Sequence, residues 1–147
     1  MNHNTSLTNL TGWLTHSLFG NMHVKVCGVR REEDALLAAE LGANAIGLLV
    51  DQRHRSPDFI SAKLAGRIAR VLSGKVTPVL VTHVPEVDKI ERLLRETEIA
   101  AVQLHSEILP DRIRELKRRL PNLTVFKIGA CPFRREYRIS HAIPGPG

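Results

Sequence analysis

The sequence predicts an α/β fold whose strands form a parallel sheet. Short runs rich in Val, Ile and Leu alternate with longer runs that space their apolar residues as a helix does. Helix start and stop residues stand at the junctions. Because each helix carries the chain back along the sheet, successive strands pair in parallel. We expect five strands at 24–27, 45–50, 76–82, 100–104 and 123–128, and four helices at 31–41, 61–72, 86–96 and 110–120.

Individual residues mark where these helices begin and end. Gly42 follows the first helix, where a left-handed cap favours glycine. Ser61 is expected to be the N-cap of the second helix, because its hydroxyl can accept a bond from a free backbone N–H. Pro85 and Pro110 are expected to open the third and fourth helices, where the missing N–H of proline costs nothing.

The spacing of the units indicates part of a (β/α)₈ barrel, the TIM barrel. The expected strand starts at Val24 and Leu123 are separated by four units of about 25 residues each, so eight such units would need about 200 residues. We therefore expect residues 23–130 to form a partial barrel of about five strands and four helices.

The two ends of the chain differ in character from this region. Residues 1–22 show no periodicity, and we expect them to be a disordered extension or to precede a true start at Met22. After Ile128 the pattern stops, and residues 131–147 are expected to be an irregular tail rich in Arg, Pro and Gly. This abrupt change suggests a truncated or frame-shifted gene end.

The composition excludes several classes of protein. With 43% apolar and 24% charged residues, the 147-residue chain has enough apolar material for one globular core. No apolar run approaches the ~20 residues that cross a bilayer, and the N-terminus does not resemble a secretory signal. Cys27 and Cys131 are too few and too far apart for a disulfide framework. We therefore expect a cytoplasmic protein that binds no membrane.

The positive charge is concentrated near the C-terminus. The formal charge of the chain is +6, and nine Lys or Arg against three Asp or Glu lie between Asp111 and Arg138. In this segment Ile113, Leu116 and Leu120 have helical spacing, which is typical of an amphipathic helix with a solvated basic face. Because no aromatic interleaving or known binding motif accompanies the charge, we expect no nucleic-acid partner.

Polar residues follow four of the predicted strands, where ligand sites of parallel α/β folds lie. Cys27 follows the first strand, and a thiol there can do acid–base work, although a lone cysteine is commonly a buried filler. Arg53 and Arg55 belong to a basic loop after the second strand, which suits a carboxylate or a phosphate or is simply a solvated loop. His83 and His105 end the next two strands; His105 points to the same rim as Cys27 if the register is kept, or is a structural histidine.

Four short motifs occur in a fixed order along the chain. They are K-V-C-G-V, E-D-A, G-A-N-A-I-G and V-Q-L-H, within the stretches VKVCGVRREEDALLAAELGANAIGLLV and AAVQLHSEILPDRIRELKRRLPNLTVFKIGA, with SPDFIS between them. Over about residues 24–130, this pattern resembles the N-terminal part of phosphoribosylanthranilate isomerase, a (β/α)₈ enzyme of tryptophan biosynthesis.

This resemblance implies an Amadori rearrangement of N-phosphoribosylanthranilate to carboxyphenylamino-deoxyribulose phosphate, with no cofactor and no metal. The ribose opens to an imine, a base removes the proton from the neighbouring carbon, and the enol relaxes to an aminoketose. The cysteine of the K-[IV]-C-G motif is the base, which is Cys27 here, and the histidine of Q-L-H is His105. With Arg53, Arg55 and His83 nearby, we expect these residues to bind a small anionic substrate.

The sequence departs from the family pattern at the rim. The S-P-R motif, whose arginine faces the anionic substrate, has Asp58 in place of the arginine, and Arg53 or Arg55 would have to compensate. The usual Q-L-H-G has Ser106 as its fourth residue, and the usual V-F-V-N is replaced by a segment that ends in Thr82 and His83.

A further departure lies beyond the fifth strand. The family's general-acid aspartate follows strand six and its phosphate loops follow strands seven and eight, and neither is recognised in this chain. We therefore expect a weak or inactive isomerase alone. The open sheet edges would then favour a complementing chain or self-association.

Two other functions remain open from the sequence. One is a non-catalytic relative that holds a small anion with its basic loop. The other is a metal-binding module, because Cys27, His54, His83 and His105 follow successive strands and are residue types that bind Zn²⁺.

Overall fold

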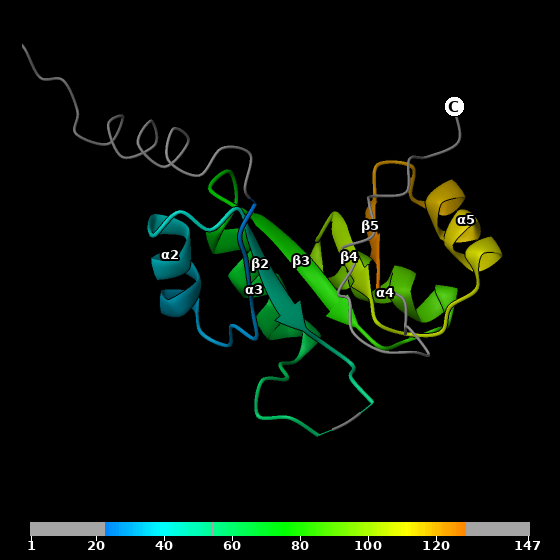
Figure 1. Cartoon of the computed structure of the whole chain (residues 1–147), viewed down its shortest axis with the longest axis horizontal. Helices are drawn as coiled ribbons and strands as arrows, with labels where there is room; N and C mark the ends of the chain where they lie inside the picture. Colours follow the sequence, from blue (N-terminus) through cyan, green and yellow to red (C-terminus); the bar gives the residue numbers. More distant parts are fainter. Residues whose placement is uncertain (1–22, 54, 129–147) are drawn as a thin grey trace, which may run out of the picture.

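The computed structural model describes residues 23–53 and 55–128, which form five strands and four helices (Figure 1). Every helix and strand lies within one residue of its predicted bounds. The predicted extension, the predicted tail and His54 lie outside the described residues. In chain order the elements are β1 (Lys25–Cys27), α2 (Glu32–Glu40), β2 (Ala45–Leu49), α3 (Ala62–Val71), β3 (Thr77–Thr82), α4 (Val87–Thr97), β4 (Ala101–Leu104), α5 (Pro110–Arg119) and β5 (Thr124–Lys127).

The sheet is parallel and its strands follow one another in the order β1-β2-β3-β4-β5. Because right-handed crossovers that all move in one direction place every helix on the same face, this order is that of a barrel wall and not of a doubly wound sheet. Figure 1 shows α2 and α5 flanking the sheet, with α3 and α4 behind it. The predicted partial barrel is confirmed, and the sheet is not closed among the described residues.

The two faces of the sheet carry different side chains. One face packs against the helices and forms the main core, which includes Ile46, Leu48, Leu80 and Val102, all fully buried. The other face carries a small apolar cluster of Val79, Val81 and Ala101, with Ala45, Leu49 and Phe126 packed against it. Residues alternate between these faces along each strand. Odd-numbered positions of β1 to β4 therefore face away from the helices, toward the concave side of the sheet.

The helix ends follow the predicted chemistry with one exception. Gly42 has a φ of +95°, and the Ser61 hydroxyl accepts a 3.2 Å hydrogen bond from the backbone N–H of Leu64. Pro110 is the first residue of α5. Pro85 was predicted to open α4, which is wrong, because Glu86 is the N-cap and the helix begins after it.

Helix α5 confirms the predicted amphipathic segment. Its residues Ile113 and Leu116 are buried, and its basic residues lie on the exposed side. Arg119 joins α5 to α4, because its guanidinium donates to Asp88 Oδ1 at 2.7 Å and to Glu91 Oε2 at 3.1 Å. The charge of Arg119 therefore contributes to the packing of α5 against α4. No described helix has the length and apolar character needed to cross a membrane.

The outer strands leave two sheet edges unpaired within the described residues. β1 pairs with β2 alone, and β5 pairs with β4 alone. The β1 edge is also apolar, because Val24 is 46% exposed and Val26 is 37% exposed. An edge of this kind is a surface onto which a further strand can pair.

Candidate functional site

Cys27 ends β1 with its thiol on the concave face. It lies in register with Gly47 of β2, and a Cβ at that glycine would come within 2.5 Å of the Cys27 Sγ and 3.3 Å of a Val81 methyl group. The sulfur therefore fills the space that any other residue at position 47 would take. Cys27 is a free, exposed cysteine, so the alternative of a buried filler is wrong.

Lys25 brings a positive charge to this thiol. It lies two residues before Cys27 on the same face of β1, and its Nζ donates a 3.1 Å hydrogen bond to Sγ. The same ammonium group donates to Gln103 Oε1 on β4. Because β2 and β3 lie between these two strands, one side chain can span them only where the sheet curves strongly. Sequence reasoning missed both residues, although the alternation of faces along K-V-C could have identified Lys25.

His105 continues this chain of polar contacts. Its Nε2 contacts the Gln103 side-chain nitrogen, and its ring packs edge-on against His83 with centroids 5.4 Å apart. Lys25 can only donate to the Gln103 oxygen, so the amide nitrogen donates to an unprotonated His105 Nε2. Burial lowers the pKa of His105, and the positive charges of His83, Lys25 and Lys127 lower it further. Protonation of His105 is therefore disfavoured in the folded chain.

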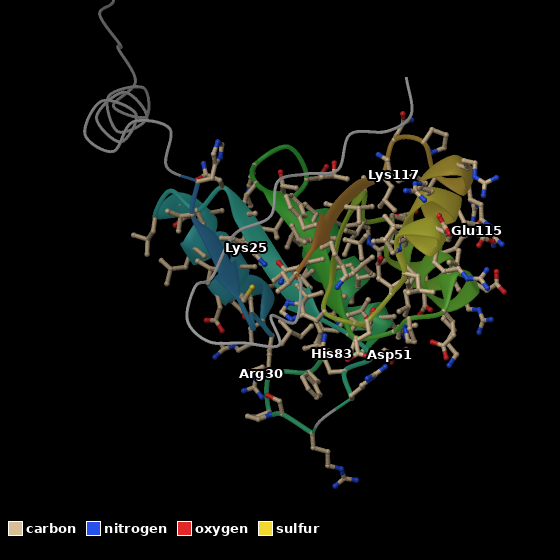
Figure 2. All side chains as sticks on the ribbon, turned by 45° about the vertical axis from the view of Figure 1, so that its right-hand side comes forward. Lys25, Arg30, Asp51, His83, Glu115 and Lys117 are labelled. Atoms are coloured by element: carbon tan, nitrogen blue, oxygen red, sulfur yellow. The ribbon has the colours of Figure 1, made fainter. Side chains whose placement is uncertain are left out.

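Of the other predicted site residues, His83 contacts His105, and neither Arg53 nor Arg55 contacts the Cys27, Lys25, Gln103 and His105 side chains. Arg53 and His83 line a cavity of about 420 Å³ at the carboxyl ends of β2 and β3. Arg55 is exposed and makes no hydrogen bond or ion pair to any described residue. Figure 2 shows His83 and Asp51 close together at this end of the sheet, whereas Lys25 lies higher on the concave face.

Asp58 lies directly beside the end of β1. A Cβ at Gly28 would be 3.5 Å from the Asp58 carboxyl carbon, so this carboxylate borders the residue after Cys27. A cation that sequence reasoning did not consider lies near this carboxylate. Arg30 donates to the backbone carbonyl of Pro57, which brings its guanidinium to the loop that holds Asp58. Arg30, rather than Arg55, therefore supplies positive charge next to the departure from the family pattern.

The two other rim departures are structural. The Thr82 hydroxyl is fully buried; it donates to the Asp51 carbonyl at 3.3 Å and accepts from the Val84 N–H at 3.3 Å. Ser106 is also buried and donates to the Val84 carbonyl at 3.4 Å. These hydroxyls join loops to one another, and neither bonds the Cys27, Lys25, Gln103 or His105 side chains.

No metal centre is found in the described part of the chain. No three His, Cys, Asp or Glu side chains there come together in a way that could hold a metal ion. Of the four proposed ligands, His83 and His105 are neighbours through ring packing, and His54 lies outside the described residues.

The fold and the site together define a class of protein. A parallel sheet wound in one direction, with a thiol, an ammonium group and a histidine on the face opposite its helices, is the wall of a (β/α)₈-type barrel with the polar residues of its lumen.

Comparisons with known proteins give the family. The chain is 44% identical over 106 residues to N-(5'-phosphoribosyl)anthranilate isomerase 2 of Methanosarcina mazei, covering 72% of this chain and 47% of that protein. The crystal structure of phosphoribosyl anthranilate isomerase from Thermus thermophilus has a TM-score of 0.65 and 35% identity, over 77% of this chain and 55% of that chain.

A third relative was solved with a ligand. It is a phosphoribosyl anthranilate isomerase in complex with reduced 1-(o-carboxyphenylamino)-1-deoxyribulose 5-phosphate, with a TM-score of 0.65 and 34% identity, over 74% of this chain and 54% of that chain. No protein-family model matches the chain. Over the matched residues the chain belongs to the phosphoribosylanthranilate isomerase family, which confirms the resemblance. It spans about half the length of the curated relatives it matches.

The contact between Gly47 and Cys27 can be tested by substitution. Gly47→Ala should lower the free energy of unfolding by about 1–3 kcal/mol, because the new methyl group overlaps Sγ and the sheet must shift. Gly66→Ala is the matched control, since a Cβ there meets only ordinary contacts in helix α3, where alanine favours helix. Urea unfolding measures both; equal stability of the two variants would contradict this packing.

The lowered pKa of His105 predicts a pH dependence. The unfolded chain binds a proton near the ordinary pKa of 6.5, and the folded ring resists it, so the free energy of unfolding should fall as the pH drops below 6.5. His105→Gln should reduce this fall. Urea unfolding at about pH 7.5 and about pH 5.5 gives the comparison. An unchanged pH dependence in His105→Gln would refute the assignment.

Proposed function

We propose that this chain supplies the Cys27 side of a phosphoribosylanthranilate isomerase site, acting in tryptophan biosynthesis in the cytoplasm. The observation that carries the proposal is the exposed Cys27 thiol on the concave face, 3.1 Å from the Lys25 ammonium. The family match supports it, because the K-V-C-G and V-Q-L-H motifs supply residues of this same face.

The reaction needs a base of this kind. In the ring-opened imine, the base removes the proton from the carbon next to the imine carbon, and the electrons of that bond form an enol conjugated with nitrogen. The enol then relaxes to an aminoketose, so atoms and electrons balance within the substrate. A thiol acts as such a base in its anionic form, and a cation that donates a hydrogen bond to the sulfur stabilises that form.

The anionic substrate is proposed to bind over the same face. Gln103 and His105 lie on this face with Cys27 and Lys25. Arg30 and Arg53 place guanidinium groups in the loops at the carboxyl ends of the strands. Asp58 opposes an anionic group beside β1, so we propose that Arg30 offsets it and that Arg55 does not. The resemblance alone had favoured Arg53 or Arg55.

The acid side of the reaction is proposed to come from further βα units. The described residues place a base on the concave face, and the edges of β1 and β5 are unpaired among them. A polypeptide that pairs with both edges would enclose the concave face and exclude water from it. Self-association through the same edges is the alternative, and the oligomeric state measured with and without such a fragment distinguishes the two.

The experiment is turnover of phosphoribosylanthranilate by the full chain, with and without a fragment that supplies the remaining βα units. We expect weak turnover alone and a gain with the fragment. Cys27→Ser should lower kcat by about 10²–10⁴-fold, because it removes the base. Cys131→Ser is the matched control and should retain activity.

Absence of turnover in both arrangements would reject the isomerase proposal. A non-catalytic, anion-binding relative would then be favoured, since Asp58 disfavours an anionic substrate beside β1.

A further inference from the structure

The cavity at the ends of β2 and β3 is lined by two cations of α4, Lys89 and Arg92, that the isomerase proposal does not use. Its volume of about 420 Å³ is enough for a phosphate group with a small sugar attached. It lies beside the first two turns of α4, and neither Cys27 nor Lys25 lines it. Its charged lining consists of three cations and two carboxylates: Arg53, Lys89, Arg92, Asp51 and Glu86.

Arg92 is not paired with the carboxylate that its spacing on the helix would favour. Asp88 lies four residues before it, the spacing at which carboxylate and guanidinium pair on a helix. That carboxylate instead accepts a 2.7 Å hydrogen bond from Arg119 of α5. Glu91 is also taken, because Arg95 and Arg119 both donate to it and together lower its pKa. Arg92 makes no hydrogen bond or ion pair to any residue that the structure describes.

Arg53, in the loop after β2, also lines the cavity and makes no hydrogen bond or ion pair to the described residues. Several other described arginines are paired: Arg67 bonds Glu32 at 2.6 Å, and Arg70 lies 3.6 Å from Glu98. Lys89 has only an exposed pair with Glu86 at 3.4 Å, which contributes little to stability. The cavity therefore brings together two unpaired guanidinium groups and one weakly paired ammonium group.

We propose that this cavity is a binding site for a phosphate group, either free phosphate or a small phosphate monoester. Guanidinium groups suit this ligand because they donate two parallel hydrogen bonds to its oxygens. Arg53 binds it from the loop after β2 and Arg92 from α4, and Lys89 adds charge from the first turn of α4. The site shares Arg53 with the proposed substrate rim, whereas Cys27, Lys25, Gln103 and His105 do not line it.

Isothermal titration of the full chain at low ionic strength tests this site, with inorganic phosphate and with ribose 5-phosphate as probes. We expect saturable binding, which Arg92→Gln weakens about tenfold by removing one charge-assisted contact. Arg53→Gln should act in the same way. The matched control is Arg95→Gln on the same helix, since Arg95 bonds Glu91 and does not line this cavity.

The outcomes are distinct. Tighter binding of ribose 5-phosphate indicates a monoester ligand, and equal binding indicates free phosphate; both support the site. Cys27→Ser should bind phosphate as the parent chain does, so failure of the isomerase leaves this result unaffected. Absence of saturable binding, or equal loss in the Arg92 and Arg95 variants, would overturn the proposal.

Discussion

The position of the Cys27 sulfur depends on the missing side chain of Gly47. Parallel pairing sets these two residues side by side, and only a hydrogen at position 47 leaves room for the thiol on the concave face. The polar contacts of the thiol depend on this position of the sulfur on the concave face. Lys25 reaches it along the same strand, and Gln103 and His105 extend the contacts across the sheet.

The charges of the molecule are divided between stability and binding. On the convex side, Arg119 takes the carboxylates of α4 and joins two helices. Because Asp88 pairs with Arg119, Arg92 has no carboxylate partner among the described residues, and it lines a cavity. On the concave side, one ammonium group lies between a thiol and an amide, and a histidine with a lowered pKa continues the chain. The ion pairs that join α5 to α4 therefore determine which cation of α4 is left unpaired beside the cavity.

Most of the fold was predictable from the sequence, because local signals and tertiary packing agree. Alternating apolar runs indicated the strands, and Ser61 and Gly42 marked helix ends with the bonds and dihedral angles expected of them. Pro85 misled, because a proline can stand before the N-cap as well as after it. The place where polar side chains gather was also predictable, since the strand ends of a parallel sheet converge.

The partners within the site were less predictable, because they depend on curvature and loop paths. Lys25 meets Gln103 only because the sheet bends across two intervening strands. Arg30 reaches the loop of Asp58 through a backbone carbonyl, a contact with no sequence signature, whereas the predicted Arg55 turns to solvent. Residue types suggested candidate side chains, and the structure shows which of them lie in contact.

The most direct test of the account is the rate at which iodoacetamide alkylates Cys27 at constant pH, in a Cys131→Ser background. If the hydrogen bond from the Lys25 ammonium assists attack by the sulfur, Lys25→Met should slow alkylation, and Lys25→Arg should retain most of the rate. Lys75→Met, at an exposed lysine beyond the opposite end of the sheet, should have no effect. Alkylation of Lys25→Met at the parent rate would contradict the central claim.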